Sequence, residues 1–383
     1  KRSIMQTIII GAGPAGLAVA GRLRKMNLPF EVLERTQKIA WSWHNHYDRL
    51  LLHTVKQLSH LPHLPFPEEY PLYVPRADLA RYYENYAAHF DIKPHFGEEV
   101  VSVKKSDEQI WQVSTQTGKR FEAENVVVAT GVNRVPFSPT WKGLDSFQGT
   151  ITHSRDYKNT QSFHGKKVLV IGMGNTGAEL ALDLAENEVE VAISVRSPIT
   201  IVPRDINGRP VQLTAKKLAK LPFGLGDWLG TQVRKLVIGD LSKYGLPMSN
   251  IHPAQQLRDT GKTPVIDLGT VEYIKNGKIK ILPDISEFHE KGIITKDGSR
   301  HDFDAVILAT GYRAKLEDFV DHTEGLLDRF DVPKQPVMDG KNEGLHFVGF
   351  DNYKLGGILG TIFSDSETVA KAIRAKINKT VAV

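Results

Sequence analysis

The chain has 383 residues, of which 41% are hydrophobic and 24% are charged, values that fit a soluble globular protein of two or three domains. The absence of cysteine excludes thiolate nucleophiles, redox disulfides, iron–sulfur clusters and cysteine-bound zinc. The net charge of +5 is spread along the chain, which favours an enzyme that binds polyanionic cofactors over a nucleic-acid-binding protein.

No apolar run approaches the ~18 residues of a membrane-spanning helix, and no signal peptide precedes the first expected strand. We therefore expect a cytoplasmic protein without membrane association. The histidines cluster early, but their spacing matches no zinc or iron site and no acidic group completes a ligand set, so no metal is expected. These early histidines are His44, His46, His53, His60 and His63.

An apolar strand at residues 7–10 runs directly into a glycine-rich turn, and a helical pattern follows it. The spacing Gly11-x-Gly13-x-x-Gly16 in this context is the dinucleotide-binding fingerprint, in which the helix N-terminus faces a pyrophosphate. The residues expected to contact the cofactor here are Gly11, Gly13, Pro14, Ala15 and Gly16.

The next expected strand ends on Glu34, 23 residues after Gly11. A carboxylate at this place accepts hydrogen bonds from ribose hydroxyls and repels a 2′-phosphate, so the first turn is predicted to bind a nucleotide without that phosphate. The alternative interpretation is a glycine-rich turn followed by an ordinary surface glutamate.

A second strand–turn–helix unit begins at Lys167 and repeats the fingerprint. Its expected contact residues are Gly172, Gly174, Asn175, Thr176 and Gly177. Its second strand ends on Arg196 and Ser197, and Arg196, 24 residues after Gly172, is assigned to the position where the first copy carries its acid. Because a guanidinium grips a 2′-phosphate, this unit is predicted to bind NADPH; the alternative is an exposed arginine at a strand end.

Two further strands end in Ala-Thr-Gly, one after each fingerprint, and are expected to turn near bound nucleotide. The expected contacts are Thr130, Gly131, Ala309, Thr310, Gly311 and Tyr312. The predicted fold is α/β with two Rossmann-like dinucleotide-binding domains, one inserted into the other. Residues 1–157 and 305–383 are assigned to the first domain, and residues 158–304 to the NADPH-binding domain.

A helical insertion is expected at about 212–259, where Leu229, Val233, Leu236 and Val237 share one helical face beside Arg234 and Lys235. Four interpretations stay open: a lid over a channel, a contact in a homodimer, a basic amphipathic helix on a membrane, and helices that pack on the second domain.

The spacing Phe147-x-Gly149-x-x-x-His153-x-x-x-Tyr157 resembles the signature of the class B flavin-containing monooxygenases, and the rest of the chain is similar to their YUCCA-like branch. This resemblance implies FAD in the first domain and an NADPH- and O2-dependent monooxygenase that works through a C4a-(hydro)peroxyflavin. It leaves S- or N-oxidation, Baeyer–Villiger oxidation and oxidative decarboxylation of an aryl keto acid open.

The same resemblance places Trp43, Lys56 and Gln57 beside the flavin and implies catalytic roles for His53 and Asn175. The alternative for His53 is a packed loop histidine. A rival function is an NADPH-dependent flavoprotein reductase that passes electrons to ferredoxin or quinone. A thiol reductase is excluded by the absence of cysteine, and two complete cofactor sites argue against a non-enzymatic NADPH sensor.

Overall fold

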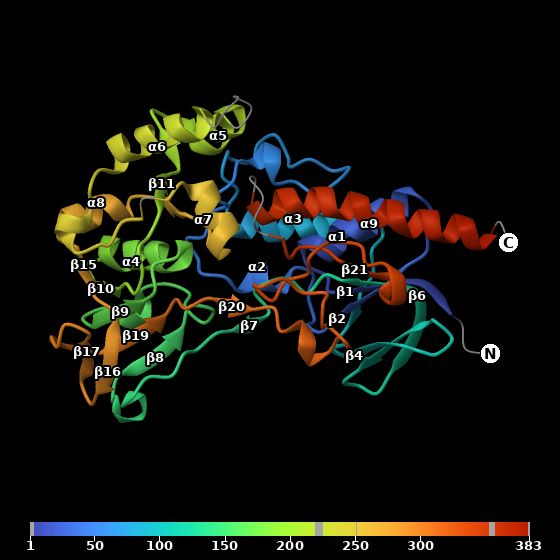
Figure 1. Ribbon diagram of the computed structural model, residues 1–383, viewed down its shortest axis with the longest axis horizontal. Coiled ribbons are helices and arrows are strands. Elements are labelled where there is room, and N and C mark those ends of the chain that lie inside the picture. Colours follow the sequence, from blue (N-terminus) through green and yellow to red (C-terminus); the bar gives the residue numbers. More distant parts are fainter. Residues whose placement is uncertain (1–3, 219–224, 250, 352–356, 382–383) are drawn as a thin grey trace. The chain divides into compact units, whose positions relative to one another are not determined.

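The computed structural model describes residues 4–218, 225–249, 251–351 and 357–381, which form two compact units (Figure 1). The first unit comprises Lys1–Asn45, Thr54–Val135 and Tyr312–Val383. The second unit comprises His46–His53 and Pro136–Gly311. The predicted α/β fold is confirmed, because each unit combines helices with a sheet whose central strands are parallel.

The sheet of the first unit has β1 at its centre, with parallel neighbours on both sides. Ile8 and Ile9 of β1 are completely buried, as expected of a parallel strand covered on both faces. In spatial order the strands are β3 (His95–Phe96), β2 (Glu31–Glu34), β1 (Met5–Ile10), β6 (Arg120–Val128), β5 (Trp111–Thr115) and β4 (Val100–Lys105), with β21 (Leu345–Phe347) also paired to β6.

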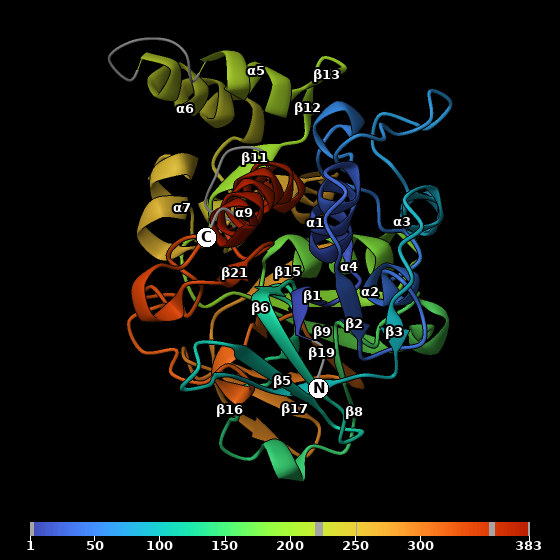
Figure 2. The ribbon, with the colours of Figure 1, turned by 90° about the vertical axis from the view of Figure 1, so that its right-hand side faces the viewer.

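Helices α1 (Pro14–Lys25), α3 (Arg76–His89) and α9 (Gly357–Val381) lie on one side of this sheet (Figure 2). The buried Arg22 joins α1 to α9, since its Nε donates to Ser366 Oγ at 3.0 Å and its Nη2 to the Phe363 carbonyl at 3.0 Å. The shorter helices of this unit are α2 (Trp41–Asn45), η1 (Lys56–Leu58), η6 (Leu316–Asp318) and η7 (Gly340–Asn342).

The second unit is built on an entirely parallel sheet. Its strands in spatial order are β15 (Ile279–Leu282), β10 (Glu190–Ser194), β9 (Lys167–Ile171), β19 (Ala305–Leu308) and β8 (Thr150–His153). Helix α4 (Asn175–Glu186) follows β9 and packs its buried Leu180, Ala181 and Leu184 into the core of this unit. Because all five strands run the same way, their carboxyl ends lie at one edge, where α/β proteins bind nucleotides.

Smaller elements complete the second unit. An antiparallel group contains β16 (Ile285–His289), β17 (Gly292–Thr295) and β18 (Arg300–Asp302); two pairs are formed by β11 (Ile201–Pro203) with β14 (Val265–Asp267) and by β12 (Asp205–Ile206) with β13 (Arg209–Pro210). The helices are η2 (Leu144–Ser146), η3 (Gln161–Phe163) and α8 (Thr270–Lys275). The short strands β7 (Val135–Pro136) and β20 (Tyr312–Arg313) occur where the chain passes between the units.

The segment predicted as a helical insertion contains α5 (Val211–Leu218), α6 (Leu225–Ile238), η5 (Ser242–Tyr244) and α7 (Pro253–Thr260). Its C-terminal part packs on the second unit, because Ile238, Leu241 and Leu246 are buried in that unit's core. The predicted apolar face behaves differently: Leu236 is 86% exposed, Val233 and Val237 are 42% exposed, and the side chain of Leu229 lies outside the described residues.

The observed units differ from the expected domain boundaries in three segments. Residues 305–308 form β19 between β9 and β8 and therefore belong to the second sheet, as does β8. Residues 46–53 also belong to the second unit, because Tyr47 is buried in its core. Hydrogen bonding and burial thus assign 46–53, 136–157 and 305–311 to the second unit rather than to the first.

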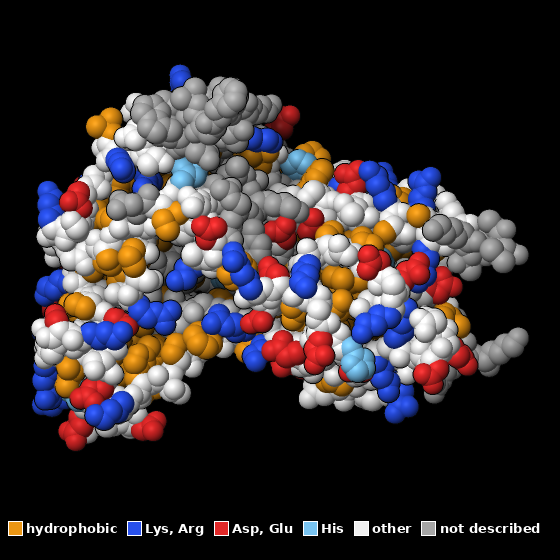
Figure 3. Space-filling view, in the orientation of Figure 1, with side chains coloured by type: hydrophobic (Ala, Val, Ile, Leu, Met, Phe, Trp, Pro, Cys, Tyr) orange, Lys and Arg blue, Asp and Glu red, His pale blue; other side chains and the backbone are white. Residues whose placement is uncertain are grey.

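Among the described helices, none combines the length and apolar character needed to cross a bilayer. On the face shown in Figure 3, lysine and arginine side chains are interspersed with aspartate and glutamate. That face shows no separate basic stripe of the kind that binds nucleic-acid phosphates.

Candidate functional site

The first glycine turn connects β1 to α1 in a geometry that admits little other than glycine. Gly11 has a φ of +107°, and a Cβ there would lie 2.8 Å from the Ala129 carbonyl oxygen. A Cβ on Gly16 would lie 1.9 Å from the Gly11 carbonyl oxygen, so α1 passes directly over the turn. Gly13, by contrast, has no protein atom within 4 Å of its Cβ position. Its open side is where a pyrophosphate approaches the backbone in this motif.

Glu34 lies at the end of β2 and is only 8% exposed. Its Oε2 accepts a hydrogen bond from the Ala12 amide at 2.8 Å, while its Oε1 accepts from the Thr36 amide and hydroxyl at 2.9 and 2.8 Å. Through the Ala12 amide, the Glu34 carboxylate therefore holds the glycine turn in place. Each carboxylate oxygen has further acceptor capacity, so this role is compatible with a ribose contact.

The end of β6 supplies two further predicted contacts. A Cβ on Gly11 would lie 3.6 Å from the Thr130 amide nitrogen, so this strand end adjoins the turn. Thr130 Oγ1 is buried and has no hydrogen-bond partner among the described residues, and Gly131 has a φ of +74°. A buried hydroxyl without a partner beside an open glycine fits a dinucleotide that brings its own polar groups.

The other predicted flavin contacts of the first unit lie outside the glycine turn. Lys56 Nζ donates to the carbonyls of Glu68 and Tyr70, at 2.7 and 2.5 Å, while Gln57 is exposed. The Trp43 ring lies 6.1 Å from that of the buried Tyr83. Lys56 therefore also has a structural role, because it closes the loop at 56–70.

The second glycine turn, between β9 and α4, repeats the geometry of the first. Gly172 has a φ of +99° and its Cβ would lie 2.7 Å from the Ala309 carbonyl oxygen. A Cβ on Gly177 would lie 2.0 Å from the Gly172 carbonyl oxygen, and Gly174 again faces open space. Thr176, the second residue of α4, is half-buried. The two glycine turns of this chain therefore have the same backbone geometry.

The backbone registers of the two turns show which residue replaces the acid. The Gly11 amide donates to the Leu33 carbonyl, and the Gly172 amide donates to the Ser194 carbonyl. Glu34 therefore corresponds to the buried Val195, and Arg196 lies one residue beyond the position assigned from residue spacing. Apolar Val195 removes the charge that would repel a 2′-phosphate, and the exposed Arg196 and half-buried Ser197 follow it.

Asn175 begins α4, and its side chain is bound to the neighbouring β14 segment. Its Oδ1 accepts from the Ile266 amide at 2.7 Å, and its Nδ2 donates to the Pro264 carbonyl at 3.2 Å. One hydrogen of the Nδ2 group remains for another acceptor. Asn175 therefore ties the glycine turn to 264–266, a role that its position in the sequence did not indicate.

The four signature residues all lie in the second unit. Phe147 is buried with its ring 5.8 Å from that of Phe288. Burial lowers the pKa of His153, whose Nδ1 accepts from the Arg155 amide at 3.1 Å; its Nε2 is therefore protonated and donates to the Gly311 carbonyl at 3.2 Å. This contact fixes the end of β19, where Ala309 borders the glycine turn and the Thr310 hydroxyl donates to the Phe137 carbonyl.

Replacing Gly149 by alanine is expected to destabilise the second unit by about 1–3 kcal/mol, because the new methyl group overpacks the site. Its Cβ would lie 2.3 Å from Phe147 Cζ and 2.6 Å from the Asp304 carbonyl oxygen. The matched control is Gly230→Ala on α6, where no atom lies within 4 Å and helix propensity favours alanine. Urea unfolding curves would measure both; equal stability of the two variants would contradict the steric argument.

Two buried acids on α4, Glu179 and Asp183, were not predicted from the sequence as site residues. Glu179, 2% exposed, accepts from the Tyr47 hydroxyl at 2.7 Å and lies 3.1 Å from His53 Nε2. Arg49 lies 3.4 Å from Asp183 and 3.9 Å from Glu179. His53 is thus oriented by a glutamate from the second glycine-turn helix.

The signature tyrosine binds the same helix, since the Tyr157 hydroxyl donates to Asp183 Oδ2 at 2.6 Å. The available signal was the presence of Glu179 and Asp183 in a helix whose adjacent residues are apolar, namely Leu180, Ala181, Leu182 and Leu184. A charged residue among buried ones requires a partner, but the sequence does not name it.

Comparison with known proteins identifies the family of this chain. The family model described as flavin-binding monooxygenase-like matches residues 5–326. The probable indole-3-pyruvate monooxygenase YUCCA7 of Arabidopsis thaliana is 37% identical, over 95% of this chain and 87% of that protein. The indole-3-pyruvate monooxygenase YUCCA1 of Oryza sativa subsp. japonica is 38% identical, over 96% and 91%.

Solved structures share the fold at lower identity. A flavin-containing monooxygenase from Stenotrophomonas maltophilia superposes with a TM-score of 0.75 at 19% identity, covering 98% of this chain and 99% of that one. An oxidised steroid monooxygenase bound to NADP gives a TM-score of 0.76 at 20% identity, covering 99% and 86%. The predicted resemblance is confirmed: the chain belongs to the flavin-binding monooxygenase-like family.

Proposed function

We propose that this enzyme uses FAD, NADPH and O2 for the oxidative decarboxylation of an aryl-substituted 2-oxo acid. The net reaction converts the 2-oxo acid, O2, NADPH and a proton into the shortened carboxylate, CO2, NADP⁺ and water. The carrying observation is the identity of 37–38% to indole-3-pyruvate monooxygenases over almost the whole chain. Bound flavin supplies the electron- and oxygen-transfer chemistry, and the protein supplies binding, orientation and exclusion of water.

FAD is assigned to the first glycine turn. The open side of Gly13 and the partnerless hydroxyl of Thr130 support a nucleotide here, and Glu34 supports one that lacks a 2′-phosphate. Trp43, Lys56 and Gln57 are proposed to contact the flavin because the family resemblance assigns that role to this stretch. The peptide groups of the turn and the N-terminus of α1 would face the pyrophosphate.

NADPH is assigned to the second glycine turn. Gly174 leaves the same open approach, and Arg196 has no ion-pair or hydrogen-bond partner among the described residues. A free guanidinium one residue after Val195 is able to bind a 2′-phosphate bidentately. Ser197 would add a hydroxyl donor.

His53 and Asn175 are our proposed catalytic residues. Glu179 accepts from His53 Nε2, which leaves Nδ1 to accept the hydroxyl hydrogen of a reacting group. Asn175 keeps one Nδ2 hydrogen to donate to a reacting oxygen. Both side chains are held by protein partners, so they would offer their hydrogen bonds without reorganisation.

Product analysis tests the reaction class. The purified enzyme would be given NADPH, O2 and one of three substrates: indole-3-pyruvate, a cyclic ketone or a thioether. We expect the shortened acid and CO2 from indole-3-pyruvate, in a ratio near one to the NADPH consumed. Release of all oxygen as hydrogen peroxide with every substrate, or NADPH oxidation that requires a quinone rather than O2, would contradict the proposal.

Arg196→Gln is expected to raise the KM for NADPH by about 10- to 100-fold, because a charge-assisted bidentate contact contributes roughly 1.5–3 kcal/mol. The KM for NADH should change less than about threefold, since NADH lacks the 2′-phosphate. Steady-state kinetics with both nucleotides measure this. The matched control is Arg35→Gln. Arg35 is exposed and follows Glu34 in the first unit as Arg196 follows Val195 in the second. Equal changes for NADPH and NADH would remove the assignment.

A further inference from the structure

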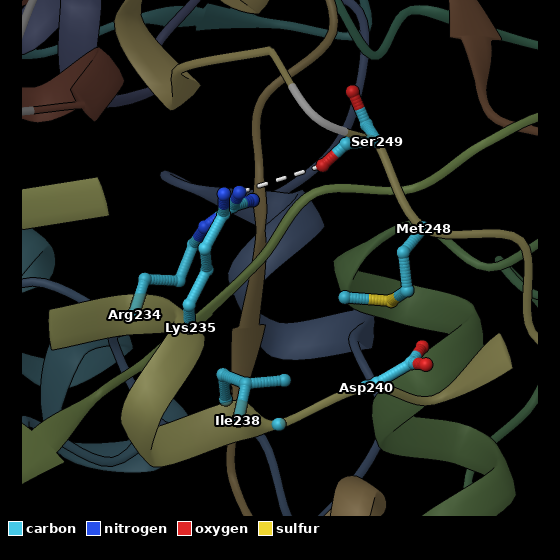
Figure 4. A pocket seen from close by; sticks show the side chains of 7 residues that line it. Arg234, Lys235, Ile238, Asp240, Met248 and Ser249 are labelled. Atoms are coloured by element: carbon cyan, nitrogen blue, oxygen red, sulfur yellow. Dashed lines mark hydrogen bonds between the residues drawn. The ribbon is translucent and has the colours of Figure 1, made fainter. Parts of the chain in front are cut away.

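A pocket of about 270 Å³ lies at the C-terminal end of α6, within the second unit (Figure 4). Its lining residues lie between 234 and 249, far in the sequence from the glycine turn at 172–177. None of the residues assigned to a cofactor lines this pocket. The side chains that line it are Arg234, Lys235, Ile238, Asp240, Met248 and Ser249.

Arg234 is a buried charge for which the described part of the chain provides no counter-charge. Only 6% of the surface of Arg234 is exposed to solvent. Nη2 donates a long hydrogen bond of 3.4 Å to the Ser249 carbonyl, and Nη1 is buried without any hydrogen-bond partner in the described part of the chain. No carboxylate among the described residues forms an ion pair with it. Burial lowers the pKa of Arg234, as desolvation of a cation must.

The orientation of α6 places Arg234 inside the protein and leaves most of its apolar face outside. Ile238 lies one turn after Arg234 on the same face and is buried in the core, which directs Arg234 inward. At the same time Val233, Leu236 and Val237 remain exposed. α6 therefore buries a cation while apolar residues face solvent. Such a cation is strongly unfavourable unless an anion accompanies it.

We propose that this pocket binds a small organic monoanion, whose carboxylate pairs with Arg234. Nη1, which is buried without a hydrogen-bond partner among the described residues, donates to one carboxylate oxygen. The side chains of Ile238 and Met248 provide apolar wall for a flat apolar body. Figure 4 shows Arg234 and Lys235 extending from α6 toward the segment that carries Ser249.

The charges around the pocket select a monoanion over a polyanion. Lys235 and Asp240 are both exposed at its rim, and Asp240 accepts from the Ser242 amide at 2.9 Å. With Arg234, the formal charge of the lining is two positive and one negative, so a single negative charge neutralises it. A phosphate dianion or a nucleotide would meet the Asp240 carboxylate as well.

Calorimetric titration with benzoate tests the pocket, with benzamide as its neutral counterpart of the same shape and ionic strength held constant. Benzoate is expected to bind at one site and raise the unfolding temperature, while benzamide binds at least about tenfold more weakly because it lacks the charge. Inorganic phosphate is expected to bind more weakly than benzoate. Equal binding of benzoate and benzamide, or tighter binding of phosphate, would overturn the proposal.

Arg234→Met is the decisive variant. It should bind benzoate at least about tenfold more weakly than the wild type, and without ligand its unfolding temperature should equal or exceed that of the wild type, because an unpaired buried charge has been removed. An unchanged affinity for benzoate would overturn the proposal, as would a lowered unfolding temperature with no ligand effect. If Arg234→Met does not fold, Arg234→Lys provides the comparison, since it keeps the charge but loses the forked donors.

Two controls separate this pocket from other cationic places. Lys217→Met removes an exposed lysine from α5 and should leave benzoate affinity unchanged. Arg196→Gln should also bind benzoate as the wild type does. Loss of benzoate binding in Arg196→Gln would assign the anion to the nucleotide site instead and would overturn the proposal. Because binding is measured without turnover, the outcome is independent of the proposed reaction.

Discussion

Gly13→Ala is expected to give a folded chain that has lost most of its flavin, whereas Gly174→Ala should retain flavin and lose affinity for NADPH. Both glycines are N-cap residues with extended backbone, at φ −82° and −88°, which alanine adopts without strain. Neither Cβ would meet a protein atom within 4 Å. The added methyl group therefore obstructs only what approaches from outside, the pyrophosphate of the cofactor.

The expected losses of affinity are about tenfold or more for the cofactor of the substituted turn, from steric overpacking of roughly 1–3 kcal/mol. Flavin absorbance of the purified protein and NADPH titration measure the two sites separately. Gly16→Ala serves as the disruptive comparison, because its Cβ would lie 1.9 Å from a backbone oxygen and the turn itself must move. If both alanine variants lost the same cofactor, the assignment of one cofactor to each turn would be wrong.

His346→Gln is expected to reduce the acid sensitivity of the first unit. His346 lies in β21, is 3% exposed, and its Nδ1 has no hydrogen-bond partner among the described residues. Burial, with a smaller contribution from Lys376, lowers its pKa to about 3. The folded state therefore keeps His346 neutral at a pH where the unfolded chain, with a histidine pKa of roughly 6.5, binds a proton.

Above the histidine pKa of the unfolded chain, His346 is neutral in both states and the folded state has its full stability. As the pH falls from about 6.5 toward about 3, only the unfolded chain binds the proton, so the free energy of unfolding decreases. The loss amounts to about 1.4 kcal/mol per pH unit inside that window. Glutamine does not titrate, so the difference in unfolding free energy between wild type and variant should shift in favour of the variant by this slope. Urea unfolding at pH 7, 6, 5 and 4 measures the difference; a constant difference would show that His346 binds its proton equally well in the folded and unfolded states, which would contradict the lowered pKa.

The glycine turns could be predicted from sequence because their causes are local. A positive φ at Gly11 and a close helix crossing at Gly16 require glycine whatever surrounds them. The parallel sheets followed from the same short segments, since apolar runs such as Ile8–Ile10 occur in strands covered on both faces. Residue spacing was less exact: it placed Arg196 where the backbone register places Val195.

The buried polar contacts could not be predicted, because their partners are distant in the chain. His53 meets Glu179 across 126 residues and Tyr47 meets it across 132. The orientation of α6 was also decided by tertiary packing: the periodicity of Val233, Leu236 and Val237 indicated a shared apolar face without saying what covers it. In the structure this face is exposed, while Ile238 anchors the helix and turns Arg234 inward. Periodicity identifies a face and leaves open which face the core accepts.

Because residues 46–53 belong to the second unit, neither unit can be expressed as one continuous stretch of the chain. The chain passes between units at four places, after Asn45, His53, Val135 and Gly311. A recombinant piece spanning 136–311 would omit Arg49 and His53, and Glu179 and Asp183 would then lie buried without their basic partners. A circular permutation or domain exchange of this chain has to carry the 46–53 segment along with α4.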